Sequence, residues 1–90
     1  MKVKISSRGI NGTTTFSIYL DDEPVITGKG VSDFSKEIME TYPELAKDMH
    51  KSFELDGEAP SNISFTGVEP GKKFELLEAV SNVYKINNNK

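Results

Sequence analysis

The fold is decided by residues 33–55, which read DFSKEIMETYPELAKDMHKSFEL. Apolar side chains recur there every three or four residues, which is the spacing of one face of an α-helix. They are Phe34, Ile38, Tyr42, Leu45, Met49 and Phe53, with Met39 and Ala46 beside them. Acidic side chains recur at the same spacing on the opposite side, and we call these five the acidic stripe: Asp33, Glu37, Glu40, Glu44 and Asp48. The pattern predicts a helical segment with one apolar side in the core.

A proline interrupts this segment. Pro43 inside a helix would remove a hydrogen bond and disfavour helical geometry at Tyr42. Thr41 and Glu44, however, have the spacing of a capping box, and proline is tolerated in the first turn of a helix. With two helices, the acidic stripe is aligned only within each half. The sequence leaves two alternatives, a single kinked helix over 33–54 and two helices over about 33–40 and 42–54.

Two segments before the helical region alternate between apolar and polar residues, as half-buried strands do. They cover residues 2–8 and 14–20, and Asn11-Gly12 between them favours a two-residue type I′ turn. Such a turn pairs Ile5 with Ile18, so that the apolar side chains of both strands share one face. The sequence therefore predicts an antiparallel hairpin in a defined register.

A third strand is predicted over residues 24–28, after the acidic turn Asp21-Asp22-Glu23-Pro24. It completes a three-stranded antiparallel meander. Its register stays open, because the neighbouring residues Val25 and Ile26 cannot both face the core.

The end of the chain is predicted to add a strand and a helix. Residues 62–67 alternate weakly and indicate a short strand, and Glu69-Pro70-Gly71-Lys72 suits a type II turn. Residues 72–85 are long and uninterrupted, which favours a helix over the alternative of a strand. Residues 87–90 are expected to form a disordered tail. The chain, 1–90, is thus predicted to be a single α+β domain.

Composition argues against an enzyme. The chain has 90 residues and no cysteine, which excludes disulfides and thiolate metal sites. A chain of this size buries about 60–65% of its extended surface, enough for one core but not for a deep substrate cavity as well. His50 is the only histidine and is expected at the edge of the helix rather than as a general base. Asp21, Asp22 and Glu23 lack the spacing of a calcium loop. We expect no catalytic residue, cofactor or metal.

A glycine-rich segment precedes the helical region. Gly28-Lys29-Gly30 lies just before the expected N-cap at Ser32 or Asp33, and helix N-termini can bind phosphate. The longer pattern of a phosphate-binding loop is missing, and Asp33 brings negative charge to the same end. We interpret the glycines as the end of the third strand.

No apolar run approaches the roughly 18 residues that a membrane span needs. Met1-Lys2-Val3-Lys4 also lacks the apolar core of a signal peptide. These features predict a cytoplasmic protein that does not act on membranes.

Five features follow one another along this part of the chain: the strand Phe16-Ser17-Ile18-Tyr19-Leu20, an acidic turn, a short strand, Gly28-Lys29-Gly30, and a serine that opens a helix. This order resembles the second half of double-stranded RNA-binding domains, over roughly residues 2–50. The resemblance implies β-β-β-α order and RNA binding. That family has a lysine-rich start to its last helix, where this chain has Asp33 and Phe34. The alternative function is therefore an RNA-binding module, with a basic outward sheet face in which Lys4 is paired with Tyr19. The residues of this face are Lys2, Lys4, Arg8 and Tyr19.

Charge distribution favours a different partner. Residues 32–60 hold eight acids against three lysines, a net charge of −5, whereas the whole chain has a net charge of −3. Carboxylates four residues apart on a helix repel each other, and a positively charged partner would offset that cost. The acidic stripe is therefore expected to bind a basic protein surface, with nucleic acid the less favoured partner and the oligomeric state left open. Size, acidity and lack of cysteine are similar to those of phage inhibitors of host enzymes and of defence systems such as CRISPR.

Overall fold

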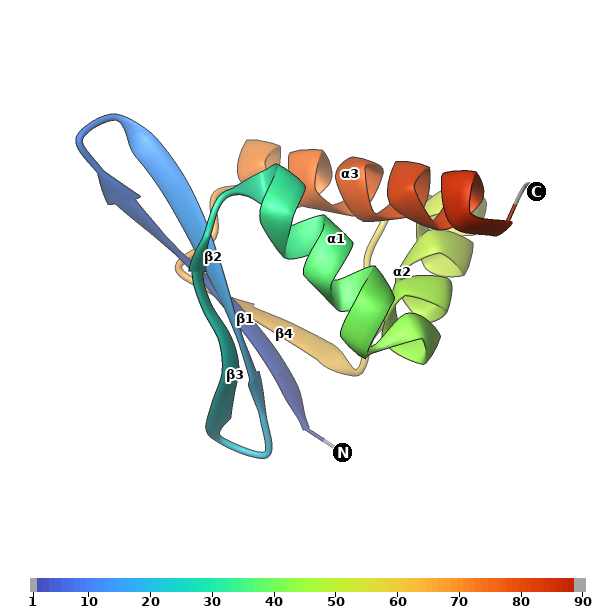
Figure 1. The fold of residues 1–90 in the computed structure, drawn as a ribbon, viewed down its shortest axis with the longest axis horizontal. Helices are drawn as coiled ribbons and strands as arrows, with labels where there is room; N and C mark the ends of the chain where they lie inside the picture. The colour runs from blue at the N-terminus through green and yellow to red at the C-terminus, as the bar shows by residue number, and fades with distance from the viewer. Residues whose placement is uncertain (1, 89–90) are drawn as a thin grey trace.

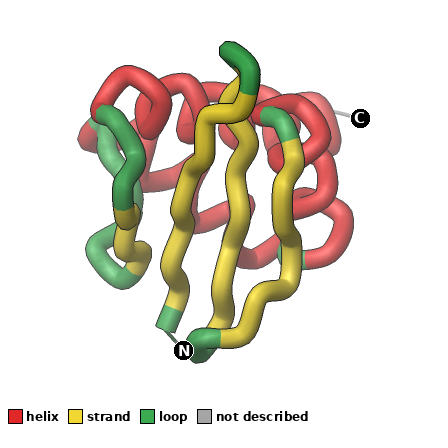
Figure 2. The backbone as a smooth tube through the Cα atoms, turned by 90° about the vertical axis from the view of Figure 1, so that its left-hand side faces the viewer, coloured by secondary structure: helices red, strands yellow, loops and turns green. Residues whose placement is uncertain are grey.

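The computed structural model describes residues 2–88 and confirms the α+β architecture. Four strands form one sheet in the order β3-β2-β1-β4, and three helices lie together on one side of it (Figure 1). The view onto the sheet shows the strands in front of the helices (Figure 2). No helix of the described residues covers the other face of the sheet (Figure 2). Within residues 2–88, no helix combines the length and the apolar character needed to cross a membrane.

The first hairpin has the register predicted from the sequence. Strand β1 (Val3–Ile10) pairs with β2 (Thr13–Leu20), and Ile5 lies opposite Ile18. The turn residues Asn11 and Gly12 have φ angles of 50° and 79°. Because a type I′ turn requires positive φ at both central residues, the Asn-Gly pair determines the turn and hence the register.

Strand β3 (Glu23–Lys29) follows a second two-residue turn, in which Asp21 and Asp22 also have positive φ, 51° and 69°. Its pairing with β2 is irregular on both sides of Ile18, which lies opposite Ile26. This pairing settles the register that the sequence left open. Ile26 faces the core and is buried, whereas Val25 is exposed. Bulges on an edge strand also hinder pairing with another chain.

The fourth strand, β4 (Ile63–Thr66), lies beside β1 and runs parallel to it, so the sheet is mixed. Ile63 is opposite Val3 and Phe65 is opposite Ile5. A parallel neighbour requires a long connection across the sheet. The helices between β3 and β4 supply that connection.

The segment with the acidic stripe forms two helices, α1 (Val31–Thr41) and α2 (Pro43–Asp56). Tyr42 has φ −130° and ψ 64°, which is not helical. Its N–H donates to the Ile38 carbonyl and its own carbonyl accepts from Ala46, so it ends one helix and begins the next. Pro43 takes the first position of α2, where its missing N–H costs nothing.

The predicted caps are wrong. Helix α1 begins two residues earlier than predicted, with Gly30 rather than Ser32 or Asp33 at the N-cap, and no side chain caps it. The carbonyl of Gly30 accepts the first hydrogen bond of the helix, from the N–H of Phe34. Likewise, no capping bond from Thr41 is formed at the start of α2.

Helix α3 (Pro70–Asn88) is longer than predicted at both ends. Pro70 and Gly71 open the helix instead of forming a type II turn, and the Lys73 N–H donates to the Glu69 carbonyl. Proline is well suited to a first helical position, so the dipeptide is compatible with either structure. Asn87 and Asn88, expected in a disordered tail, belong to this helix. Residues 89 and 90 of that expected tail lie outside the described residues.

The core lies between the helices and the inner face of the sheet, and Phe16 and Phe34 meet there with ring centroids 5.7 Å apart. Phe34, Ile38, Ala46 and Met49 of the predicted apolar face are fully buried. The remaining members are half-buried and pack against this core: Met39, Tyr42, Leu45 and Phe53. The buried residues are Val3, Ile5, Phe16, Ile18, Ile26, Phe34, Ile38, Ala46, Met49, Ile63, Leu76, Leu77 and Val80.

Candidate protein-binding face

The acidic stripe is divided between two helices. Asp33, Glu37 and Glu40 lie on α1, at the spacing of one helical face. Asp33 and Glu40 are exposed and Glu37 is half-buried. On a helical projection, Asp33 and Glu40 point away from the buried Phe34 and Ile38, whereas Glu37 lies nearer the buried side.

The second half of the acidic stripe, Glu44 and Asp48, lies on α2 and is exposed. The two helices run in different directions from the break at Tyr42 (Figure 1). Of the two alternatives that the sequence left open, the structure shows two helices. The acidic stripe is aligned within each helix but does not form one continuous row.

None of the five carboxylates forms an ion pair with another residue in the range 2–88. In the described part of the chain, the three pairs within 4.0 Å join Lys2 to Asp22, Lys72 to Glu75 and Lys85 to Glu54. The lysines of α1 and α2, which are Lys36, Lys47 and Lys51, are in none of them. Within the described residues, the carboxylates of the stripe are thus not neutralised by ion pairs.

A groove adjoins the second half of the stripe. It has a volume of about 430 Å³ and lies where β1 begins, β2 ends and the two helices meet. Glu44 and Asp48 line it from α2. Its other lining residues are Val3, Leu20, Thr41, Tyr42, Pro43, Leu45 and Asn62. The sequence alone did not reveal this groove, because its walls come from segments far apart in the chain.

The alternative nucleic-acid face lies on the open side of the sheet. Lys4 is paired with Tyr19, as predicted, and its Nζ is 4.7 Å from the centre of the Tyr19 ring. Arg8 is exposed nearer the tip of the hairpin and pairs with Thr15. Alternation along β1 places Lys4 and Arg8 on the same side. The structure thus pairs Lys4 with Tyr19 and places Arg8 further along the same face of the strand.

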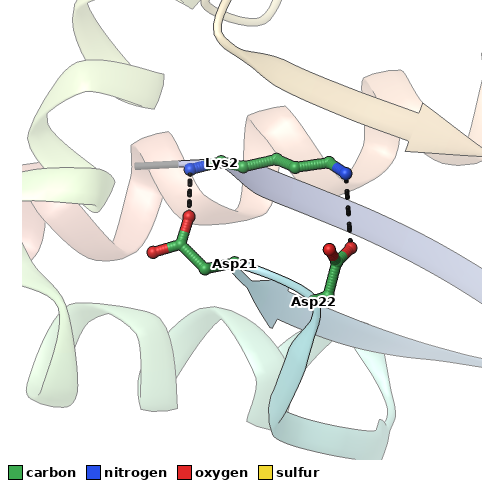
Figure 3. Close-up of polar contacts among 3 residues, drawn as sticks. All are labelled: Lys2, Asp21 and Asp22. Atoms are coloured by element: carbon green, nitrogen blue, oxygen red, sulfur yellow. Dashed lines mark hydrogen bonds and ion pairs between the residues drawn. The ribbon is translucent and has the colours of Figure 1, made fainter.

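Lys2, the fourth residue of that face, is held by the second turn. Its Nζ lies 3.3 Å from Asp22 Oδ1, and its backbone N–H donates to Asp21 Oδ1 over 2.8 Å (Figure 3). The Asp21 N–H in turn donates to the Lys2 carbonyl. Asp21 and Asp22 therefore fasten the start of β1 to the turn.

His50 occupies a structural position. It is half-buried between α2 and α3, with Nδ1 2.7 Å from the buried Ser81 hydroxyl. Its ring also stacks on Tyr84 at a centroid distance of 4.8 Å.

The glycine-rich segment before α1 also has a structural role. Gly28 has φ +60° and its N–H donates to the Ser17 hydroxyl, while Gly30 is the N-cap of α1. The backbone positions of Gly28 and Gly30 thus explain the two glycines as the end of β3 and the start of α1.

Comparisons with models of protein families, with curated proteins and with solved structures found no match to this chain.

Proposed function

We propose that this protein is a non-enzymatic inhibitor that docks the acidic stripe onto a basic surface of another protein. The supporting observation is that, among the residues the structure describes, none of the five carboxylates forms an ion pair, although three lysines share their helices. A partner rich in Lys and Arg would neutralise the repulsion around Glu37, which has no lysine at helical spacing, and would attract the other carboxylates. Negative charge gathered on one pair of helices would also steer a cationic partner toward it.

The proposed target is a protein whose basic surface binds nucleic acid. An acidic helix face presents negative charges to the arginines and lysines that would otherwise bind phosphate. Occupying that surface would block the target without any catalytic step. In size and acidity this fits a phage-type regulator of a host enzyme or defence system, of the anti-CRISPR kind. A cytoplasmic location is part of the proposal.

Affinity capture with mass spectrometry tests the proposal. The reversal variant Glu37→Lys/Glu40→Lys/Glu44→Lys is compared with the wild-type protein. We expect the wild-type protein to retain a basic partner that this variant loses. Retention of every captured protein by the variant would contradict the proposal.

A matched variant controls for overall charge. Glu58→Lys/Glu69→Lys/Glu78→Lys changes the net charge from −3 to +3, as the reversal variant does, but at exposed positions outside the acidic stripe. It should keep the partner. Circular dichroism of both variants checks that each one folds.

RNA binding through the open sheet face is the second candidate. It is supported by the Lys4–Tyr19 pair, with Arg8 further along the same strand, and by the fact that no helix of residues 2–88 covers that face (Figure 2). Basic groups next to an aromatic ring suit phosphate contact and base stacking. The order β1-β2-β3-α1 also agrees with the resemblance to double-stranded RNA-binding domains.

Fluorescence anisotropy with labelled single- and double-stranded RNA tests this candidate. If Lys4 and Arg8 contact phosphates, binding weakens with salt, and changing either residue to alanine lowers the salt slope by about 0.7–0.9. No binding to either RNA at low salt would eliminate the candidate.

A further inference from the structure

Resting on the proposed function, we infer that the groove at the junction of α1 and α2 receives one apolar side chain of the partner, flanked in the partner's sequence by lysine or arginine. The groove is the concave part of the surface next to the acidic stripe. Interfaces concentrate their binding energy in a few side chains that fill such pockets. The groove would therefore provide the anchor, and the stripe the surrounding charge.

The groove is more than large enough to receive one side chain. At about 430 Å³, it is near the lower end of the range of about 300–1,000 Å³ for small-molecule pockets. Much of its wall is apolar, from strand ends on one side and from the helix junction on the other. These apolar residues are Val3, Leu20, Tyr42, Pro43 and Leu45.

The negative charge at the groove favours basic residues on either side of the inserted side chain in the partner's sequence. Glu44 and Asp48 line it, are exposed and have no ion pair among the described residues. A phosphate or an acidic peptide would meet two like charges there, which opposes binding. A leucine or an aromatic residue between two arginines would instead pack against the apolar wall, while the arginines form ion pairs with the two carboxylates. The groove thus fits a basic protein segment and not a nucleic acid.

NMR titration of the ¹⁵N-labelled full chain tests this inference. The probe is the capped tripeptide Arg-Leu-Arg, with Arg-Ser-Arg and Glu-Leu-Glu as controls. We expect Arg-Leu-Arg to move the amide signals of groove residues with a Kd of about 1 mM, as one small anchor allows. Each control should bind at least tenfold more weakly. Equal binding of Arg-Ser-Arg, or no shift of groove signals by Arg-Leu-Arg, would overturn the inference.

Two tryptophan variants separate the groove from the rest of the surface. Asn62 lines the groove and is exposed, so Asn62→Trp fills it without changing charge. Ser64, two residues further on, is exposed and pairs with Lys4 on the open sheet face, so Ser64→Trp is the matched control. Asn62→Trp should weaken Arg-Leu-Arg binding at least tenfold, and Ser64→Trp should leave it unchanged.

The same variants distinguish this inference from the proposed function. If Asn62→Trp still captures the partner with unchanged affinity while reversal of Glu37, Glu40 and Glu44 abolishes capture, the anchor is wrong and the acidic docking stands. If the reversal variant also retains the partner, both are wrong.

Discussion

Replacing Glu37 by glutamine is expected to stabilise the folded protein while weakening its binding to a partner. On α1, Glu37 has Asp33 four residues before it and Glu40 three residues after it, and no lysine at either spacing. Each like-charged neighbour costs about 0.2–0.5 kcal/mol. Removing both repulsions should therefore raise the free energy of unfolding by about 0.4–1 kcal/mol. That corresponds to a rise of about 2–8 °C in Tm for a domain of this size.

Urea unfolding at two salt concentrations measures this effect, because urea carries no charge. The Debye length falls from about 30 Å at 0.01 M salt to about 3 Å at 1 M, whereas neighbouring side chains on a helix are about 5–6 Å apart. The gain should be present at low salt and nearly absent at high salt. Glutamine and glutamate have similar helix propensities, so little else changes.

Asp48→Asn is the matched control. Its repulsion by Glu44, four residues before, is opposed by attraction to Lys51, three residues after. The free energy of unfolding should hardly change. If Glu37→Gln instead lowers stability at both salt concentrations, the Glu37 carboxylate already has a favourable partner within the protein. The claim that it is available for docking would then be wrong.

Three further predictions concern the fold and are checked by urea unfolding. Phe34→Ala removes a fully buried side chain that packs on Phe16 and should cost about 3–5 kcal/mol; a loss below 1 kcal/mol would mean that α1 is not anchored there. Ser81→Ala removes the partner of His50 Nδ1 and should cost about 1 kcal/mol, and no loss would mean that the bond adds nothing. Gly12→Ala places a side chain at φ +79° and should cost about 1 kcal/mol, whereas an unchanged stability would contradict the type I′ turn.

The register of the first hairpin could be predicted to the residue because its information is local, although both strands extend closer to the turn than predicted. Alternation identifies the two strands, and positive φ at Asn11 and Gly12 determines the turn that sets the register. The apolar face of α1 and α2 was also predictable, since Phe34, Ile38 and Met49 all enter the core. Within each helix, the helical period identifies the buried residues, even though the break at Tyr42 separates the two helices.

Features that depend on distant segments were not predictable. The sequence of residues 62–67 does not indicate that this strand pairs in parallel with β1. The groove likewise needs Leu20, Tyr42 and Asn62 together, which only the folded chain achieves. Local signals were ambiguous at Pro70-Gly71, because proline suits both a turn and the first position of a helix. The acidic stripe was recognisable as a pattern, but the division at Tyr42 needed the backbone angles.

Carboxyl footprinting by mass spectrometry, on the complex with a captured partner, tests the central claim most directly. A carbodiimide couples an amine to accessible carboxylates, and each of the 14 acidic residues is read separately. The proposal predicts that labelling of Asp33, Glu37, Glu40, Glu44 and Asp48 falls on binding, while that of Glu58, Glu69 and Glu78 stays unchanged. If the five carboxylates are labelled equally in the free and the bound protein, they do not form the docking surface.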